Sequence, residues 1–221
     1  MTRPRRLVVV AGTGTEVGKT WVGAAAARVL VARGVRVGAR KPAQSFEADD
    51  PTTDADELAA ATGEDPFVVC QDHRRYLVPM APPMAAAVLG APAIHLAELV
   101  AEVEASWPDA ADADAPELGL VELAGGVRSP AAEDGDGVDL TALLAPDLVL
   151  LVADAGLGTI NAVRLTVDAL AGTPGADAPV VVHLNRFDVG SDLHRRNRDW
   201  LVDRCGYEVT TDLDALADAL C

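Results

Sequence analysis

The sequence predicts an α/β fold, a doubly wound and mostly parallel sheet with helices on both faces. Short runs rich in Val and Leu alternate along the chain with segments of helical length. These runs lack the polar alternation of half-exposed strands, which is typical of strands buried on both faces. A glycine-rich loop follows the first run and leads into the first helical segment. In such a fold ligands bind at the carboxyl ends of the strands, so functional residues are expected just after each run.

The order of the predicted elements follows from these runs. The predicted strands are LVVVA (7–11), VRVGA (35–39), LGLVEL (118–123), DLVLLVA (147–153) and PVVVHLN (179–185). The predicted helices are 19–33, DADELAAATG (54–63), APPMAAAVLG (81–90), IHLAELVAEVEASW (94–107), INAVRLTVDALAG (160–172) and SDLHRRNRDWLVDRCG (191–206). The acidic stretches DADAP and EDGDG are interpreted as solvated loops. No repeat and no long linker interrupts this order, so residues 1–221 are expected to form a single domain.

Composition and charge exclude several classes of function. The formal net charge is −16, which opposes binding to nucleic acid or to an anionic membrane. The three cysteines are far apart and form no C-x-x-C motif, so no disulfide framework, zinc site or iron–sulfur cluster is expected. No apolar run reaches transmembrane length, and the run after the basic N-terminus is too short for a signal peptide. We therefore expect a cytoplasmic protein.

The stretch AGTGTEVGKT (11–20) is the strongest motif, although it departs from the strict G-x-x-x-x-G-K-[ST] pattern, which requires glycine where Thr13 stands. Its glycines let backbone N–H groups turn toward a phosphate, and the helix that follows adds its positive end. Lys19 would reach the terminal phosphates, and Thr20 would ligate Mg²⁺. The predicted nucleotide-binding residues are Gly12, Thr13, Gly14, Thr15, Glu16, Val17, Gly18, Lys19, Thr20 and Trp21, with Asn185 and Arg186 at a later strand end.

Lysine usage singles out a second residue. The chain has 18 basic residues, and Lys19 and Lys41 are its only lysines. Lysine is a compact, mobile point charge, whereas arginine is a rigid planar fork, so a site that needs the former does not accept the latter. Lys41 ends the second predicted strand, beside the first loop. It is therefore a candidate catalytic residue together with Lys19; the alternative is a surface lysine.

Two carboxylates are candidate magnesium ligands. Glu122 ends an apolar strand and is followed by Gly125 and Gly126, which allow a ligand to approach the backbone. Asp54 opens a predicted helix, and capping of that helix explains it equally well. Mg²⁺ prefers a few carboxylates together with phosphate oxygens and water.

Two later strand ends carry weaker signals. Gly158, Thr159 and Asn161 begin a helix whose free N–H groups suit a carboxylate, although simple capping is about equally consistent with the pattern. Asn185 offers an amide that can both donate to and accept from an adenine edge, and the alternative is a turn-forming asparagine.

The chain resembles the dethiobiotin synthetases, biotin-pathway enzymes of the P-loop class. The resemblance is carried by GTGTEVGKT, KPAQS, TDADELAAATG, RYLVPMAPPMAA, VELAGG, GLGTINAVRLT and LNRFD, which occur in the family's order over nearly the whole chain. The family's loop has five residues between its glycines, as between Gly12 and Gly18 here. The resemblance implies that MgATP, CO₂ and 7,8-diaminononanoate are converted to dethiobiotin through a carbamate and a carbamic–phosphoric anhydride.

The resemblance also implies roles for individual residues. Lys19 and Lys41 would stabilise charge on the transferred phosphoryl group, and Thr20, Asp54 and Glu122 would hold Mg²⁺. Thr15 and Ser45 would contact the carbamate and the diamine. The turn at 158–161 would hold the substrate carboxylate, completed by the second subunit of a homodimer, and Asn185 would contact adenine. The predicted substrate-binding residues are Thr15, Ser45, Gly125, Gly126, Gly158, Thr159 and Asn161.

Departures from the family pattern leave alternatives open. Leu123 stands where the family has glycine in Glu-Gly-Ala-Gly-Gly, and the C-terminal segment lacks the Gly-x-x-Pro turn that encloses adenine. The alternatives are a related ATP-dependent ligase with a different amine or carboxylate substrate, a partition-type ATPase switch, and an inactive regulatory domain. The acidic surface and the absence of a basic amphipathic C-terminal helix oppose the switch, and the intact Lys19, Thr20, Lys41 and Glu122 oppose the inactive domain.

Overall fold

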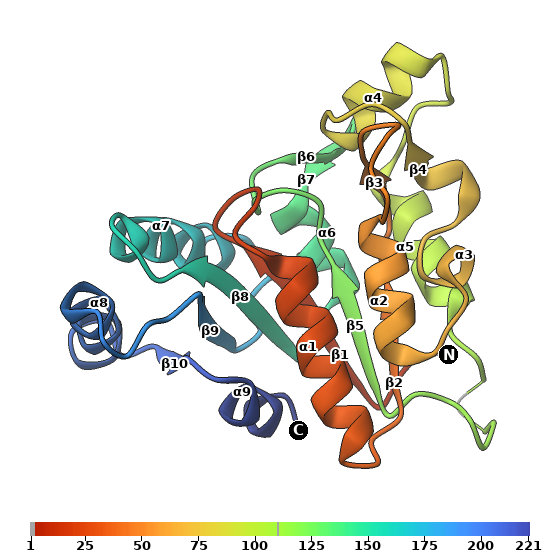
Figure 1. The fold of residues 1–221 in the computed structure, drawn as a ribbon. Helices are drawn as coiled ribbons and strands as arrows, with labels where there is room; N and C mark the ends of the chain where they lie inside the picture. The colour runs from red at the N-terminus through yellow and green to blue at the C-terminus, as the bar shows by residue number, and fades with distance from the viewer. Residues whose placement is uncertain (1–2, 110) are drawn as a thin grey trace.

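A six-stranded parallel sheet forms the centre of the protein in the computed structural model, which describes residues 3–109 and 111–221. The strand order is β10-β9-β8-β1-β5-β2, and every pair within it is parallel. Helices lie on both faces (Figure 1), so the predicted doubly wound fold is confirmed. The sheet strands are β1 (Arg6–Gly12), β2 (Val37–Arg40), β5 (Leu118–Glu122), β8 (Leu148–Asp154), β9 (Val180–Asn185) and β10 (Glu208–Thr210).

Alternate residues of each strand enter two separate hydrophobic cores. Val8 and Val10 of β1 pack with α1, α2 and α9, whereas Leu7 and Val9 pack with α5, α6, α7 and α8 on the other face. Both faces of the sheet are therefore dry, which explains why its strands are continuous apolar runs. The helices are α1 (Lys19–Ala32), α2 (Asp54–Thr62), α3 (Pro66–Val69), α4 (Pro82–Leu89), α5 (Leu96–Ser106), α6 (Gly137–Leu144), α7 (Thr159–Ala171), α8 (Asp192–Asp203) and α9 (Leu213–Leu220), with a 3₁₀ turn η1 (Asp72–Arg74).

The acidic stretch EDGDG is more ordered than the predicted solvated loop. It contributes to β7 (Gly135–Asp136), which pairs with β6 (Pro130–Ala132), and it leads directly into α6. The Asp136 carboxylate accepts hydrogen bonds from the backbone N–H groups of Val138 and Asp139 and so caps that helix. The prediction holds for the exposed turn at Glu133 and Asp134 and was wrong for residues 135–137, where Asp136 bonds to the backbone of α6.

Two further regions were not assigned from the sequence. Strands β3 (Gln44–Ser45) and β4 (Arg75–Tyr76) form a small parallel pair beside the main sheet. The C-terminal segment forms β10 at the edge of the main sheet and then α9, which packs beside α1. The predicted second strand also shifts, because β2 begins at Val37 and ends at Arg40.

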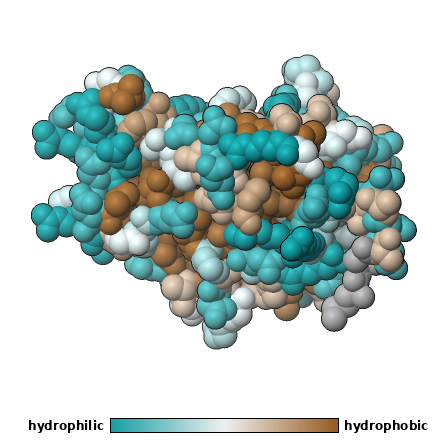
Figure 2. Space-filling view, turned by 90° about the horizontal axis from the view of Figure 1, so that it is seen from below, coloured by the Kyte–Doolittle hydropathy of each residue, from teal (hydrophilic) through white to brown (hydrophobic). Residues whose placement is uncertain are grey.

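The parallel arrangement brings the carboxyl ends of the strands to one edge of the sheet, at the top of Figure 1. Figure 2 presents the opposite side, seen from below, where hydrophobic residues lie mainly toward the middle and hydrophilic residues form most of the rim. Within the described ranges, none of the helices has the length and apolar character needed to cross a bilayer.

Candidate functional site

The loop between β1 and α1 has the conformation of a phosphate cradle. Gly18 has a φ of 91°, and a Cβ there would lie 2.2 Å from Nδ2 of Asn185, so the loop requires glycine at this position. A Cβ on Gly12 would lie 2.9 Å from the Lys19 side chain. Thr13, by contrast, does not adopt a positive φ, and its N–H donates to the carbonyl of Val152 in β8. The longer spacing thus places glycine at both ends of the loop and tolerates threonine at position 13.

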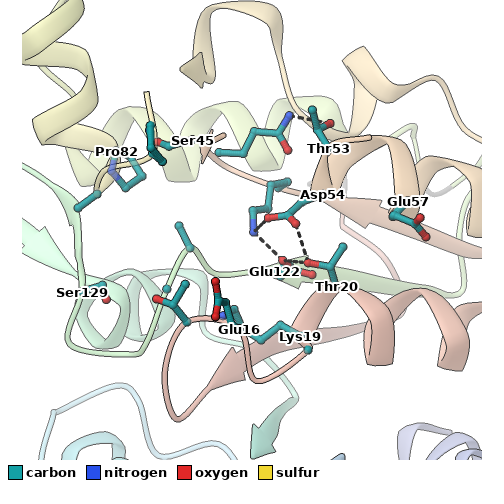
Figure 3. A pocket seen from close by; sticks show the side chains of 18 of the residues that line it. Glu16, Lys19, Thr20, Ser45, Thr53, Asp54, Glu57, Pro82, Glu122 and Ser129 are labelled. Carbon is teal, nitrogen blue, oxygen red and sulfur yellow. Dashed lines mark hydrogen bonds and ion pairs between the residues drawn. The ribbon is translucent and has the colours of Figure 1, made fainter. Parts of the chain in front are cut away.

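A cluster of polar side chains gathers beside this loop from four parts of the chain (Figure 3). The Thr20 hydroxyl lies 2.8 Å from Oδ1 of Asp54 and 2.9 Å from Oε1 of Glu122. Nζ of Lys41 lies 2.7 Å from Oδ2 of Asp54 and 2.5 Å from Oε1 of Glu122. Nζ of Lys19 donates to the carbonyl of Gly14 at 3.1 Å. Four residues proposed from the sequence therefore form one bonded group, and Lys19 lies beside it at the start of α1.

The neighbouring elements hold this cluster in place. Strand β5 lies between β1 and β2, so Lys41 is not directly beside the loop but meets Glu122 at the end of β5. Arg40, the residue before Lys41, is buried, pairs with Glu64 at 2.7 Å and stacks 4.0 Å from the Trp107 ring centroid. Asp54 is the first residue of α2, which Thr53 caps.

Burial and neighbouring charges set the protonation of the cluster. Burial lowers the pKa of Lys19, and the charge of Lys41 lowers it further. Burial opposes the charge of Lys41 too, but the carboxylates of Glu122 and Asp54 outweigh it and raise the pKa of Lys41 above its ordinary value. The charge of Lys41 lowers the pKa of Asp54, whereas burial raises the pKa of Glu122. Lys41 is therefore a stable cation held between two acids.

The oxygen atoms of the cluster fit a magnesium ion. Thr20, Asp54 and Glu122 offer only oxygen donors, and Oε2 of Glu122 is buried without a hydrogen-bond partner. Across the described residues there is no group of three or more His, Cys, Asp or Glu side chains suited to a metal. A site with two carboxylates and one hydroxyl suits Mg²⁺ that keeps phosphate and water ligands.

A cleft of about 710 Å³ opens beside the cluster. Thr15 lines it, and Figure 3 shows Lys19 and Thr20 on one side and Ser45 on another. Oγ of Ser45 is buried and without a hydrogen-bond partner, so it is available to a ligand. Gly125, which has a φ of 66°, lines the cleft as well, whereas Gly126 donates its N–H to Oγ of Ser129.

A second cavity of about 480 Å³ lies at the other end of the loop. Asn185 and Arg186, both predicted to bind the nucleotide, line it. Nδ2 of Asn185 donates to the carbonyl of Val17 at 2.9 Å, and Oδ1 accepts from the Arg186 N–H at 2.9 Å. Asn185 therefore fastens the end of β9 to the phosphate loop.

The turn at 158–161 lies apart from the cleft in the single chain. Gly158, which has a φ of 93°, precedes α7, and Oγ1 of Thr159 is buried without a partner. Neither Gly158, Thr159 nor Asn161 lines the cleft. These residues form the start of α7, which no side chain caps, and they lie apart from the cluster of Lys41 and Glu122.

Several residues that line the cleft were not proposed from the sequence. Gln44 joins the site to α2, since it accepts from the Ala55 N–H and donates to Oγ1 of Thr53. Ser129 lies under Gly125, where a Cβ would approach its hydroxyl to 2.6 Å. The other unassigned lining residues are Thr52, Thr53, Glu57, Pro79, Met80, Ala81, Pro82 and Ala124. The only signal for residues 79–82 was the proline-rich motif in which they occur.

Leu123 faces the core instead of the cleft. Its side chain is 2% exposed and packs in the core on the α5 and α6 side of the sheet. Its φ is not positive, so the backbone accepts a Cβ there. The departure from glycine at this position is therefore a packing change.

Comparisons with known proteins agree with this geometry. The family model described as an AAA domain, AAA_26, matches residues 6–186. An ATP-dependent dethiobiotin synthetase from Streptomyces avermitilis is 45% identical over 163 residues, which is 72% of this chain and 63% of that protein. A protein of the same name from Rhodococcus erythropolis is 38% identical over 90% of this chain and 84% of that protein. Another from Parafrankia is 36% identical over 86% of this chain and 76% of that protein.

Solved structures support the fold. A DUF1611 family protein from Anabaena variabilis matches with a TM-score of 0.53 and 15% identity, over 99% of this chain and 58% of the other. The signal recognition particle receptor FtsY from Elizabethkingia anophelis matches with a TM-score of 0.51 and 15% identity, over 100% of this chain and 66% of the other. At such identities the likeness concerns the fold alone.

Proposed function

The chain belongs to the family of ATP-dependent dethiobiotin synthetases, and from this premise we propose that it forms dethiobiotin from 7,8-diaminononanoate, CO₂ and ATP. The observation that carries the proposal is the contact of Thr20, Lys41, Asp54 and Glu122 beside the phosphate loop. These residues come from distant parts of the chain and supply the charges that phosphoryl transfer needs.

The reaction is a sequence of three bond changes. One amine of the substrate adds to CO₂ and loses a proton, which gives a carbamate. A carbamate oxygen attacks the γ-phosphorus of ATP, ADP leaves, and a carbamic–phosphoric anhydride forms. The second amine then attacks the carbonyl carbon, phosphate leaves, and the cyclic urea closes with loss of a proton. No step requires a protein nucleophile, so the protein's contribution is positioning and charge stabilisation.

The two lysines stabilise the transferred phosphoryl group in this proposal. Lys19 follows the loop directly, and Lys41 lies in the bonded cluster beside Thr20. Charge on the phosphoryl oxygens develops in the transition state, and fixed cations in a partly dry cleft stabilise it without reorganising. Because Lys41 is already bound to Asp54 and Glu122, its position is preorganised.

Thr20, Asp54 and Glu122 are proposed to hold Mg²⁺. Their oxygen-only donors and the unpartnered Oε2 of Glu122 support this assignment. When bound, the ion neutralises negative charge on the nucleotide phosphates.

The substrate is proposed to lie in the cleft, with its amines toward Thr15 and Ser45. The buried, unpartnered hydroxyl of Ser45 supports contact with an amine or carbamate. The substrate carboxylate is assigned to the start of α7, where Oγ1 of Thr159 is also unpartnered. Because this turn does not line the cleft of its own chain, we propose that a homodimer brings it to the partner's cleft; light scattering of the purified protein tests that state.

The substrates and the net charge indicate the binding partners and the cellular location of the proposed enzyme. The nucleotide and the diamine are small molecules, and the net charge of −16 disfavours nucleic acid and anionic lipid as partners. We place the enzyme in the cytoplasm, where ATP is available. Fractionation of the native cells with detection of this chain tests the location.

The identity of the product tests the proposed function. Purified protein, MgATP, bicarbonate and the diamine are incubated together, and the products are analysed by mass spectrometry. We expect a product with the mass of dethiobiotin, which carries one carbon-13 atom when labelled bicarbonate is supplied. Unlabelled product, or ATP binding without that product, would reject the reaction. A different substrate is not favoured by Leu123, since this residue packs in the core.

A further inference from the structure

Trp21 follows the phosphate loop directly and projects from the first turn of α1. We propose that its indole is the surface on which the nucleotide base stacks, and that the base is recognised by this stacking more than by hydrogen bonds to its edge. The inference rests on the proposed nucleotide site and assigns a specificity-determining residue within it.

The position of Trp21 joins the two cavities. Trp21 and Gly18 are the residues that line both the cleft beside Lys41 and the cavity beside Asn185. A nucleotide whose phosphates lie on the loop must extend past this junction to place its base in the second cavity. The Trp21 side chain is 57% exposed there, so a flat aromatic face is available to a ligand.

The polar side chains at the floor of the second cavity already have partners. Nδ2 of Asn185 donates one hydrogen bond to the Val17 carbonyl, and Oδ1 accepts one from the Arg186 N–H. The Arg186 guanidinium pairs with Asp154 at 3.0 Å and donates to the carbonyl of Glu16 at 3.0 Å. These bonds fix the orientation of both side chains, which organise the phosphate loop.

The polar side chains on the C-terminal side of the cavity are engaged in the same way. Asp212 accepts from the Ala215 N–H and caps α9. Nδ1 of His183 lies 3.0 Å from Oγ1 of Thr210, and the ring is 3% exposed. The cavity therefore combines an exposed indole with Asn185, Arg186, His183 and Asp212, which bond to the fold, and with the lining residue Thr211.

This combination predicts a particular pattern of nucleotide preference. Stacking of a base on an aromatic side chain contributes about 1–3 kcal/mol and tolerates any base, because every base has a π-face. A site built to hydrogen-bond one edge rejects the wrong partner by roughly 10⁴-fold or more. We therefore expect adenine and guanine nucleotides to bind within about tenfold of each other, a difference of about 1.4 kcal/mol.

The test measures binding without turnover. Calorimetry with Mg²⁺ and a non-hydrolysable ATP analogue, its guanine counterpart or inorganic tripolyphosphate compares wild type with Trp21→Ala and Trp21→Phe. Trp200→Ala is the matched control, because Trp200 is 50% exposed on α8 but lines neither cavity. Intrinsic fluorescence gives a second readout, since a stacked base quenches an indole.

The inference predicts a loss confined to ligands that carry a base. Trp21→Ala should bind the ATP analogue about 5- to 100-fold more weakly, with tripolyphosphate binding unchanged. Trp21→Phe should retain most of the affinity and lose the nucleotide-dependent quenching, and Trp200→Ala should match wild type in affinity and quenching.

Three results would overturn the inference. Unchanged affinity of Trp21→Ala for the ATP analogue would remove the base contact. An equal loss for tripolyphosphate would show that Trp21 acts through the loop, and a strong preference for adenine over guanine would show recognition of the base edge. These results leave the proposed function standing, whereas wild type that binds none of the three ligands would contradict both.

Discussion

The cleft beside the loop, the proposed phosphate end, is lined by charged side chains that bond to one another, whereas the second cavity, the proposed base end, is lined by polar side chains bonded to the fold. At the phosphate end, Lys41, Asp54 and Glu122 meet at 2.5–2.7 Å. At the base end, Asn185 holds the phosphate loop, and Trp21 offers the exposed face. The difference teaches that a group of charges bonded to one another needs particular residue types, whereas an exposed aromatic face needs only a flat side chain.

Removal of Lys41 should give the largest effect at the phosphate end. Lys41→Gln deletes a cation that we assign to transition-state stabilisation, so kcat should fall roughly 10²–10³-fold while ATP binding persists. Diamine-dependent phosphate release measures the loss, and calorimetry measures nucleotide affinity. Because the buried Glu122 and the partly exposed Asp54 lose their partner, thermal unfolding must accompany the kinetics. A folded variant with kcat near that of wild type would remove Lys41 from the mechanism.

Leu123 tests whether the departure from the family pattern concerns packing or chemistry. The side chain is 2% exposed, so Leu123→Ala should lower the free energy of unfolding by about 2–5 kcal/mol. Denaturant unfolding measures this change, with Leu143→Ala as the control because Leu143 is 54% exposed in the adjacent helix. The KM for the diamine should stay near that of wild type in the folded variant. A large shift in that KM with little loss of stability would place Leu123 in the substrate site.

The buried His183 should make the free energy of unfolding depend on pH in the acid range. Burial lowers the pKa of His183 from 6.5 to about 4. The unfolded chain therefore binds a proton between these values that the folded chain does not bind. The free energy of unfolding should fall by about 3 kcal/mol as pH drops through this window. Urea unfolding at several pH values measures the slope, and His183→Asn should flatten it. An unchanged slope in the variant would assign the acid sensitivity to carboxylates elsewhere.

Glu122 should give a smaller, metal-linked effect at the phosphate end. Glu122→Gln keeps the shape but removes a charge that we assign to Mg²⁺, so half-maximal nucleotide binding should need about tenfold more Mg²⁺. Calorimetry over a magnesium series gives the measurement. Nucleotide binding without magnesium should change little. The assignment fails if Glu122→Gln and wild type show the same magnesium dependence of nucleotide binding.

The phosphate end was largely predictable from the sequence because its chemistry restricts residue type and spacing. The loop motif identified Lys19 and Thr20, lysine usage identified Lys41, and the strand-end position identified Glu122. The parallel sheet then explains why they meet. Asp54 was ambiguous because a helix cap and a magnesium ligand use the same carboxylate, and the structure gives it contacts to Lys41 and Thr20.

The remaining features depend on tertiary contacts that no local pattern encodes. The cap formed by Asp136 looked like a solvated acid, because EDGDG carries no apolar periodicity. The cleft-lining role of Met80 and Ser129 depends on how distant segments pack. At the base end, Asn185 was predicted to contact adenine, but its bond to Val17 follows only from the positions of β9 and the loop.

Phosphate release from MgATP and bicarbonate, measured with and without 7,8-diaminononanoate, tests the central claim most directly. The account predicts that release depends on the diamine in wild type, in proportion to dethiobiotin formed, and is nearly lost in Lys41→Gln. Release that proceeds equally without the diamine, or that survives in Lys41→Gln, would contradict the assignment of this cluster to a diamine-dependent phosphoryl transfer.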